Sequence, residues 1–457
     1  MINVAMRTCT EADPIALASY AALMCYQSEV PEWGKTINVK DRLFGASHHT
    51  TIEHYYMTFV IDGIAVGDTI FGFHLVSPFY DSDQRSGRFC AKMFLVPDYR
   101  KIEDYVLSFW PETNIVILRE IMEYVKEGVN LYHENIGAAA EIAKKFIREE
   151  RPFASEDYIK LNAPKIAQEQ IRMCISVIFP TALFFTLDSV ALAAMYRSAW
   201  LPSLRFTLQK MADLLLEKHP NMAFAFGKET MRQDDWGMSF SGEPSANTFA
   251  AFKPGVSRTE IDGKENLVIP RPDICFPVDQ LFFRPETMNN SVGGISSEIV
   301  VSLATMGQDQ RHRTIARGEP SFTGDFYCPP IFKEVVPEKR VADLMKKWIA
   351  LYLKVPKSLA LILAPYGAMT RYAKKGSFNA IIHEQLKRSC WCAQEEIYHL
   401  SRALRLAIEK KEGKSSPLLR IFEPPCFKTG KCAEGVRYCG RDINLRHKGD
   451  YFPERKV

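Results

Sequence analysis

The sequence lacks the motifs that assign many enzyme classes at once. Its 457 residues contain no G-x-S-x-G nucleophile elbow, no G-x-G-x-x-G dinucleotide fingerprint and no G-x-x-x-x-G-K phosphate loop. The net charge is also small, because 58 Lys and Arg residues and 54 Asp and Glu residues leave an excess of only +4. So small an excess does not predict a nucleic-acid-binding surface. The balance of 47% hydrophobic and 25% charged residues excludes a disordered or collagen-like chain and indicates a globular protein.

An apolar signal-peptide core is missing from the first residues, MINVAMRTCTEADP. The eleven cysteines are therefore not expected to form a secreted disulfide scaffold. We predict a cytoplasmic protein in which the cysteines are thiols or metal ligands.

One apolar run, from Met173 to Tyr196, is long enough to span a bilayer at about 20 residues. Pro180 and Asp188 interrupt this run, and a charge near the bilayer centre costs roughly 2.5–3.5 kcal/mol. We therefore expect no membrane span, and we interpret the run as a buried pair of helices in the core.

The chain reads as two similar halves. Tyr56 to Ile61 (YMTFVI) is typical of a strand, and 115–129 and 136–149 show the three-and-four spacing of apolar residues that is typical of helices. A second strand-like run begins at Ile295, and helices are expected between 337 and 411. This order predicts an α+β fold of two tandem repeats, each a small mixed or antiparallel sheet with a helical layer.

Composition predicts the boundaries. A first repeat is expected over 1–219, a polar linker or insert over 220–271, a second repeat over 272–411 and a Cys-rich tail over 412–457. The linker is assigned because its segments are polar, contain glycine and show little periodicity.

The densest chemical signal lies in the second half. It consists of Gln308, Arg311, His312, Arg313, Glu319 and Ser321. Two arginines beside a histidine present planar donors that match phosphate or carboxylate, each charge-assisted bond contributing roughly 1.5–3 kcal/mol. The glutamate and the serine add an acceptor and a hydroxyl suited to a base or a ribose. A solvated basic turn is the alternative interpretation of such a segment.

A second, weaker signal is the segment with Gln84, Ser86, Gly87 and Arg88. A glycine between a hydroxyl and an arginine allows the backbone to approach an anion closely, and both side chains can bind phosphate. Taken alone, S-G-R occurs by chance in many chains.

Three histidines and a glutamate precede the first strand: His48, His49, Glu53 and His54. Their spacing differs from the i, i+4 pair of zinc proteases. A structural or cofactor-packing role is therefore favoured over metal binding.

Together these segments resemble the flavin-dependent thymidylate synthases, the family called ThyX. Ser86-Gly87-Arg88-Phe89 is similar to the family's S-G-R-Y segment, and the stretch at Glu53-His54 resembles its E-H-x-x-F-T-F. Gln308-x-x-Arg311-His312-Arg313 is similar to its Q-x-x-R-H-R motif. Arg388 followed by Ala393-Gln394-Glu395-Glu396-Ile397 resembles its R-x5-Q-x-E-I helix. The resemblance covers roughly residues 7–215 and 270–410.

The resemblance implies FAD-dependent reductive methylation of dUMP, or of a related pyrimidine nucleotide, at C5. It implies methylenetetrahydrofolate and NADPH as co-substrates, with most of the chemistry carried by the cofactor. It implies that the small-molecule nucleotide is bound by Gln84, Ser86, Gly87, Arg88, Glu319, Ser321 and Arg388. It implies that FAD is held or packed by His54, Gln308, Arg311, His312 and Arg313. No residue is assigned as certainly catalytic.

Each half departs from the family pattern in its own way. The first half has Phe73-His74-Leu75-Val76 where R-H-R would stand, and the second half has Ser321-Phe322-Thr323-Gly324, without the arginine of S-x-R-Y. One hybrid site built from both halves, or decay of both sites, would produce this pattern. Because family enzymes are homotetramers, the resemblance implies a homodimer that forms a pseudo-tetramer. The alternative function is a non-catalytic nucleotide- or flavin-binding homologue, or one that builds an oligomer.

Five cysteines near the C-terminal end form a separate signal: Cys390, Cys392, Cys426, Cys432 and Cys439. Four thiolates hold zinc tetrahedrally or ligate an iron–sulfur cluster. Their spacing is not the paired C-x2-C of zinc ribbons, so unligated thiols are the alternative. We predict a metal that ties the tail to the helix carrying Gln394, with zinc and iron–sulfur both left open.

Overall fold

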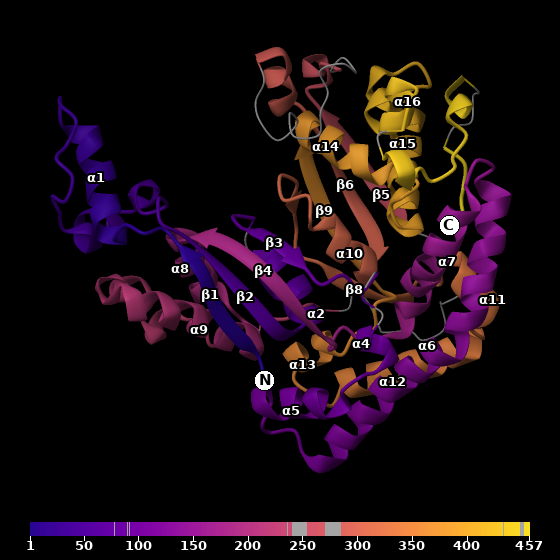
Figure 1. The fold of residues 1–457 in the computed structure, drawn as a ribbon, viewed down its shortest axis with the longest axis horizontal. Helices are drawn as coiled ribbons and strands as arrows, with labels where there is room; N and C mark the ends of the chain where they lie inside the picture. The colour runs from indigo at the N-terminus through magenta and orange to yellow at the C-terminus, as the bar shows by residue number, and fades with distance from the viewer. Residues whose placement is uncertain are drawn as a thin grey trace.

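The computed structural model describes residues 1–76, 78–88, 90, 92–234, 236–239, 254–269, 285–432, 434–447 and 452–457. These residues form a mixed α/β fold in which helices surround two antiparallel sheets (Figure 1). The expected combination of antiparallel sheets and helical layers is therefore confirmed.

The first sheet has the strand order β1-β2-β4-β3. Its strands are β1 (Asn3–Cys9), β2 (Tyr56–Ala65), β3 (Asp81–Gln84) and β4 (Pro180–Asp188). The predicted strand at YMTFVI is confirmed as the start of β2, where aromatic and β-branched residues suit a pleated, half-buried surface. Gly63 has a φ of +84°, and the β2–β4 register shifts between Asp62 and Ile64, so a glycine is favoured at this irregularity.

The second sheet has the order β5-β6-β9-β7, and β8 also pairs with β9. Its strands are β5 (Gly255–Asp262), β6 (Gly294–Ser302), β7 (Ala316–Arg317), β8 (Ser321–Phe326) and β9 (Ala368–Ser377). In both sheets the first strand pairs with the second, the second with the last, and the last with the strand before it. The second sheet begins at β5, inside the segment 220–271 that was expected to be a linker.

Helices follow corresponding strands in the two halves. Between β3 and β4 lie α4 (Lys92–Leu95), α5 (Tyr99–Phe109), α6 (Ile115–Glu150) and α7 (Glu156–Ile171), and after β4 lie α8 (Ser189–Ser198) and α9 (Pro202–Lys218). Between β8 and β9 lie α11 (Pro330–Val335), α12 (Glu338–Tyr352) and α13 (Lys357–Ile362), and after β9 lie α14 (Phe378–Arg388) and α15 (Glu395–Glu412). The two predicted helices at 115–129 and 136–149 are one continuous helix, α6.

Five further α-helices occur in the described part. They are α1 (Pro14–Tyr26), α2 (Val66–Asp68), α3 (His74–Val76), α10 (Leu303–Asp309) and α16 (Pro425–Thr429). Two π-helical turns occur at Lys40–Phe44 and Thr69–Phe73. In Figure 1, α1 projects away from the rest of the molecule, while α6 and α7 lie beside the C-terminal end.

The two halves share one hydrophobic core. Its largest cluster contains buried residues of β2, β4 and α6 together with residues of α12, α13 and β9. Polar contacts also cross between the halves, because Trp110 Nε1 donates to Ser358 Oγ at 3.0 Å and Tyr124 Oη donates to Leu363 O at 2.9 Å. The halves are therefore packed together as one folded unit.

The apolar run from Met173 to Tyr196 is not the predicted pair of helices. It forms a short 3-10 turn, then β4 and then α8. A run of apolar residues without clear periodicity fits a buried strand as well as a helix, and here β-branched and aromatic residues lie in a strand between β2 and β3. Most of the run is buried, so the expected core position is confirmed. Among the described residues, no helix has the length and apolarity that crossing a membrane requires.

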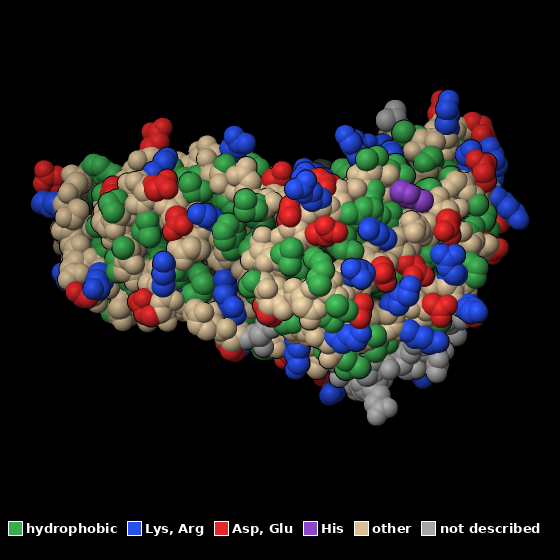
Figure 2. Space-filling model, turned by 90° about the horizontal axis from the view of Figure 1, so that it is seen from below, with side chains coloured by type: hydrophobic (Ala, Val, Ile, Leu, Met, Phe, Trp, Pro, Cys, Tyr) green, Lys and Arg blue, Asp and Glu red, His purple; other side chains and the backbone are tan. Residues whose placement is uncertain are grey.

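The helical stretch expected between 337 and 411 is also interrupted, by β9. This strand reads AMTRYAKKGS and carries three cations, which gave no strand signal. One of them, Lys374, is buried and paired with carboxylates. On the coloured surface in Figure 2, Lys and Arg are interspersed with Asp and Glu without a large patch of one sign.

Candidate functional site

The arginine-rich segment of the second half lies against β3 of the first half. Arg311 Nη2 donates to Ser82 O at 2.5 Å, and its guanidinium lies 3.7 Å from the Asp83 carboxylate. Arg313 forms an ion pair with Asp81 and lies over the Tyr80 ring at 5.1 Å. The segment that precedes Ser86-Gly87-Arg88 is thus in contact with Arg311 and Arg313.

A buried charge cluster holds the start of the arginine segment. Asp309, at the end of α10, is fully buried and accepts from Arg317 at 2.6 Å, Lys374 at 2.7 Å and Tyr372 at 3.0 Å. Burial alone would raise the pKa of Asp309, but the adjacent Arg317 and Lys374 hold it well below the usual range. The ionised carboxylate anchors the turn in which Arg311, His312 and Arg313 follow.

Arg388, at the end of α14, also forms hydrogen bonds with this segment. Its Nε donates to His312 Nε2 at 2.9 Å, and its Nη2 donates to Gln308 O at 2.7 Å. Burial, together with the charges of Arg88 and Arg311, lowers the pKa of Arg388 to about 10, although the Glu384 and Asp309 carboxylates oppose this shift. Burial and the Arg388 charge also hold the pKa of His312 well below its usual value, so its ring is neutral. With Nε2 accepting, the ring proton lies on Nδ1, which is buried without a hydrogen-bond partner.

Arg88 lies at the junction of the two halves. It forms an ion pair with Glu169 of α7, and its Nη2 donates to Cys392 O at 3.4 Å. Its backbone N–H donates to Ser86 Oγ at 3.2 Å. Gln84 is the last residue of β3, so the S-G-R segment leaves the sheet at the point where Arg311 contacts it.

Gly87 approaches a guanidinium rather than an open anion site. A Cβ at this position would lie 2.7 Å from Arg172 Nη1. The backbone is held there by Gln168, whose Nε2 donates to Gly87 O at 2.7 Å. Arg172 itself is buried and lies over the Tyr366 ring at 4.6 Å.

Sequence reasoning missed the residues that hold this loop, namely Gln168, Glu169 and Arg172. A signal was present, because polar residues cluster here at the end of a helix, directly before the apolar run, and all three are buried. Buried polar residues are uncommon unless they are paired, so such a cluster indicates a polar network. It could have been found by looking for polar residues that interrupt apolar periodicity.

Other predicted site residues lie elsewhere. His54 is exposed in the turn before β2, and β4 lies between β2 and β3. Glu319 is exposed between β7 and β8, and Ser321 begins β8 opposite Arg371 of β9. Gln308 contacts Gln394, so the two segments with the Q-x-x-R-H-R and R-x5-Q patterns do meet.

The tail cysteines partly converge. The Cys392 thiol hydrogen-bonds to the thiols of Cys390 and Cys439. These bonds lower the pKa of Cys390 to about 7 and that of Cys439 to about 6, whereas burial raises the pKa of Cys426 to about 12 and also raises that of Cys432. Within the described part of the chain, no group of three or more His, Cys, Asp or Glu side chains is arranged to hold a metal ion. The prediction of zinc or an iron–sulfur cluster therefore has no support in the structure.

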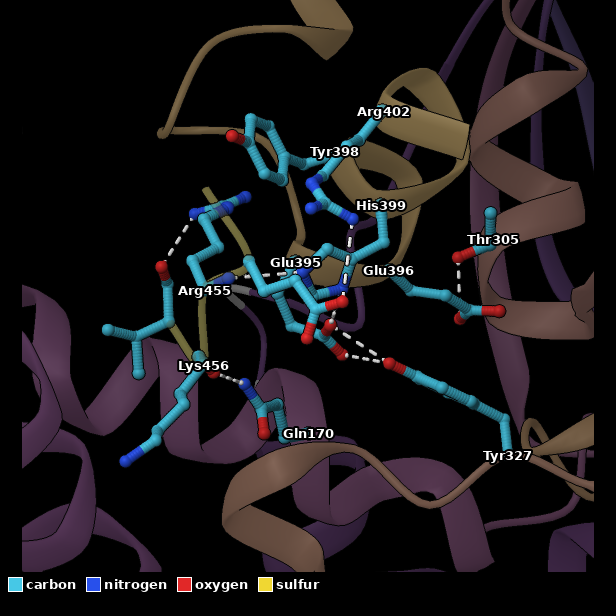
Figure 3. A network of polar contacts seen from close by, with 12 residues as sticks. Gln170, Thr305, Tyr327, Glu395, Glu396, Tyr398, His399, Arg402, Arg455 and Lys456 are labelled. Carbon is cyan, nitrogen blue, oxygen red and sulfur yellow. Dashed lines mark hydrogen bonds and ion pairs between the residues drawn. The ribbon is translucent and has the colours of Figure 1, made fainter. Parts of the chain in front are cut away.

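A network of buried carboxylates lies at the start of α15 (Figure 3). Glu395 accepts from Tyr327 Oη at 2.7 Å and from His399 Nδ1 at 3.1 Å, while His399 Nε2 accepts from the backbone N–H of Arg455 at 3.1 Å. Glu396 accepts from Thr305 Oγ1 at 2.7 Å, and burial raises its pKa to about 7. These contacts fix the start of α15, next to Gln394, which contacts Gln308.

A cavity of about 850 Å3 opens next to Arg88. One wall is α7, with Tyr158 and Glu169, and the other is the segment 391–395. This cavity lies between the two halves, as do the contacts of Arg88 and Arg311.

The fold and site describe an α/β protein with a cationic, partly buried site between two sheets. Residues 7–221 match the model of the family described as thymidylate synthase complementing protein. Over this range, just under half of the chain, the sequence is similar to that family, which confirms the resemblance found in the sequence. No curated protein matches the chain.

Three solved structures are among those similar to this chain. ThyX from Helicobacter pylori with FAD and dUMP is 16% identical, with a TM-score of 0.31, covering 50% of this chain and 100% of that one. A second complex of the same Helicobacter pylori enzyme with FAD and dUMP is 17% identical, with a TM-score of 0.30 and the same coverage. The UMP/dUMP methylase PolB from Streptomyces cacaoi, bound with 5-Br dUMP, is 16% identical, with a TM-score of 0.29, covering 50% of this chain and 94% of that one. Scores this low carry no argument about this chain.

Proposed function

We propose that the protein is a flavin-dependent enzyme that methylates dUMP, or a related pyrimidine nucleotide, at C5. The observation that carries the proposal is the contact of the Arg311-to-Arg313 turn with β3, directly before Ser86-Gly87-Arg88. Each half supplies the motif that the other lacks, and the contact of Arg311 and Arg313 with β3 supports one site built from both. This juxtaposition is what a hybrid site requires.

The residues of the turn suit FAD and a nucleotide. Arg88, Arg311 and Arg388 lie close enough for their charges to interact, and such a cluster favours phosphate groups. Buried polar atoms without partners occur beside them, namely His312 Nδ1 and Gln308 Oε1. A ligand with ring nitrogens and carbonyl oxygens would satisfy these atoms, since buried polar groups are normally paired.

The side chains of this protein would bind and orient FAD and the nucleotide. Arg311, His312, Arg313 and Gln308 would hold FAD, and Arg88, Ser86 and Arg388 would hold the nucleotide with Gln84 and Gly87 behind them. Neutral His312 can donate through Nδ1 without adding a charge. When bound, FAD would supply the hydride, with methylenetetrahydrofolate as one-carbon donor and NADPH as reductant.

We further propose that the chain is a tandem repeat of one unit. The matching strand order of the two sheets supports this, as do the helices placed between and after the corresponding strands. A homodimer of such chains would form a pseudo-tetramer.

One observation favours a non-catalytic alternative. Arg88 and Arg313 are already paired with Glu169 and Asp81, so part of the positive charge is neutralised within the chain. In a homologue that only builds an oligomer, these pairs would be structural.

The test is flavin binding followed by turnover. Purified protein should take up FAD and show its yellow absorbance, and Arg311→Ala should lose most of it. Tritium should then be released from C5-labelled dUMP in the presence of methylenetetrahydrofolate and NADPH. Colourless protein that gains no flavin absorbance would contradict the enzyme proposal.

A further inference from the structure

Three cysteine side chains meet where the C-terminal tail packs against the segment before α15. The Cys392 thiol hydrogen-bonds to the thiols of Cys390 and Cys439, and the backbone N–H of Cys392 donates to Cys390 Sγ at 3.5 Å. All three are free thiols in the structure. The proposed flavin and nucleotide contacts use none of them, so this cluster needs an explanation of its own.

The tail is held close to the loop between α6 and α7 at Gly440, directly after Cys439. Gly440 O accepts from the backbone N–H of Phe153 at 3.1 Å. Gly440 has a φ of +80°, and an added Cβ there would overlap the backbone of Ala154. This close approach keeps Cys439 in place beside Cys392.

Three buried arginines surround the segment that carries the other two thiols. Arg151 and Arg455 both donate to Trp391 O, at 3.2 and 2.9 Å, and Arg441 lies over the Trp391 ring at 4.6 Å. Their positive charges act on the neighbouring thiols. A cationic environment stabilises the thiolate, which is the form of cysteine that attacks a disulfide.

Cys392 is the most accessible of the three cysteines. It is exposed and lines the cavity of about 850 Å3 next to Arg88, whereas Cys390 is half-buried and Cys439 is buried. A small disulfide in this cavity can therefore reach Cys392 Sγ, while Cys439 is shielded. Arg88 Nη2 also donates to Cys392 O at 3.4 Å, so the cluster lies at the junction of the two halves.

We infer that Cys392 and Cys439 form a redox-active dithiol that exchanges with small-molecule disulfides. The Cys392 sulfur attacks one sulfur of the small disulfide, whose S–S bond breaks, and the first small thiol leaves. The Cys439 sulfur then attacks the Cys392 sulfur of the mixed disulfide and releases the second small thiol. The two protein thiols are oxidised by two electrons, the small disulfide is reduced, and the two protons end on the two small thiols.

Cys439, and not Cys390, is assigned as the partner of Cys392. A disulfide between Cys390 and Cys392 would close a small ring over Trp391, whose carbonyl is held by Arg151 and Arg455. Disulfides require a specific dihedral angle, and strain makes them easier to reduce. A bond to Cys439 joins two separate segments and closes no small ring.

The test is thiol mapping of the full-length protein equilibrated with mixtures of oxidised and reduced glutathione. Free thiols are alkylated, and the digested protein is analysed by mass spectrometry. We expect Cys392 and Cys439 to lose alkylation together and to appear as one disulfide-linked pair of peptides that reduction separates. Cys439→Ser should stop at a mixed disulfide between Cys392 and glutathione. Cys432→Ser is the matched control from the same tail and should form the same linked pair as the wild type.

Three results would overturn the inference. The first is a wild-type protein in which Cys392 and Cys439 stay fully alkylated in oxidised glutathione, and the second is a linked pair of Cys390 and Cys392 instead. The third is a stoichiometric metal in the purified protein that Cys392→Ser loses, because the thiols would then be ligands. The mapping of the wild type decides the outcome even where a variant does not fold. No flavin or nucleotide is needed, so the result is independent of the proposed function.

Discussion

At the scale of single residues, the need for glycine at position 87 is explained by the close approach of Arg172 rather than by contact with a ligand. We predict that Gly87→Ala loses at least tenfold in dUMP affinity and about 1–3 kcal/mol of stability, because its Cβ would lie 2.7 Å from Arg172 Nη1 and would overpack the loop. Isothermal calorimetry and urea unfolding measure both effects. Gly137→Ala is the control, because no atom lies within 4 Å of its added Cβ in α6, and alanine there should be neutral or stabilising. Equal behaviour of the two variants would contradict this account of Gly87.

Glu396 makes the stability of the protein depend on pH. Burial raises the pKa of Glu396 to about 7, whereas an unfolded glutamate titrates near about 4.3. Between these values the native state keeps a proton that the unfolded state has lost, so this residue lowers stability as the pH rises from about 4.5 to 7. Glu396→Gln should remove this contribution and flatten the slope.

Urea unfolding at several pH values between 4.5 and 7 checks the Glu396 prediction. Glu396→Gln also lowers the free energy of unfolding at every pH, because one amide oxygen replaces a carboxylate that accepts from Ser302 and Thr305. The slope of stability against pH, and not its absolute value, is therefore the readout. A variant with the same slope as the wild type would refute the assignment.

At the scale of elements, α6 shows what periodicity can predict. Its amphipathic spacing identified two helices, and the structure joins them into one helix of 36 residues. Asn114 caps it by accepting from the N–H groups of Val116 and Ile117, each at 3.0 Å. The buried face of α6 packs against α7, α11 and α12, so it links the two halves.

We predict that Asn114→Ala lowers stability by about 0.5–2 kcal/mol, because two N–H groups at the helix start lose their acceptor. Thermal unfolding measures the change. Asn114→Asp should remain close to the wild type, since a carboxylate caps equally well and is favoured at a helix N-terminus. An alanine variant as stable as the aspartate variant would show that the cap contributes nothing.

β4 and β9 show where pattern reasoning fails. β4 lies in an apolar run that fits a strand or a helix, and only its pairing with β2 and β3 decides between them. β9 carries the exposed cations Arg371 and Lys375 on one face, its other face is buried and includes Lys374, and its edges pair with β6 and with β7 and β8. In β4 the tertiary partners decide between two local possibilities, and in β9 they override the local preference.

At the scale of the whole molecule, the shared core predicts cooperative unfolding. One hydrophobic cluster includes residues of both halves, and Trp110 donates to Ser358 across them. Calorimetry should therefore show one main transition, with probes in the two halves losing structure together. Two separate transitions, one for each sheet, would show that the halves fold independently.

Sequence alone determined which motifs the chain carries. The S-G-R and R-H-R segments and the family match over residues 7–221 follow from the order of residue types, which needs no three-dimensional partner. The strand at Tyr56 followed from its aromatic and β-branched residues. The helices of α6 followed from periodicity, because side-chain burial on one face repeats along the chain.

Only the tertiary structure decided how these parts meet. Arg311 contacts Ser82 and Arg88 contacts Cys392 across more than two hundred residues of sequence, and no local pattern records such pairings. The same holds for Arg172, whose importance comes from its distance to Gly87 and not from its neighbours in sequence. Local preferences are set by adjacent residues, whereas a site between two halves is set by the packing of a common core.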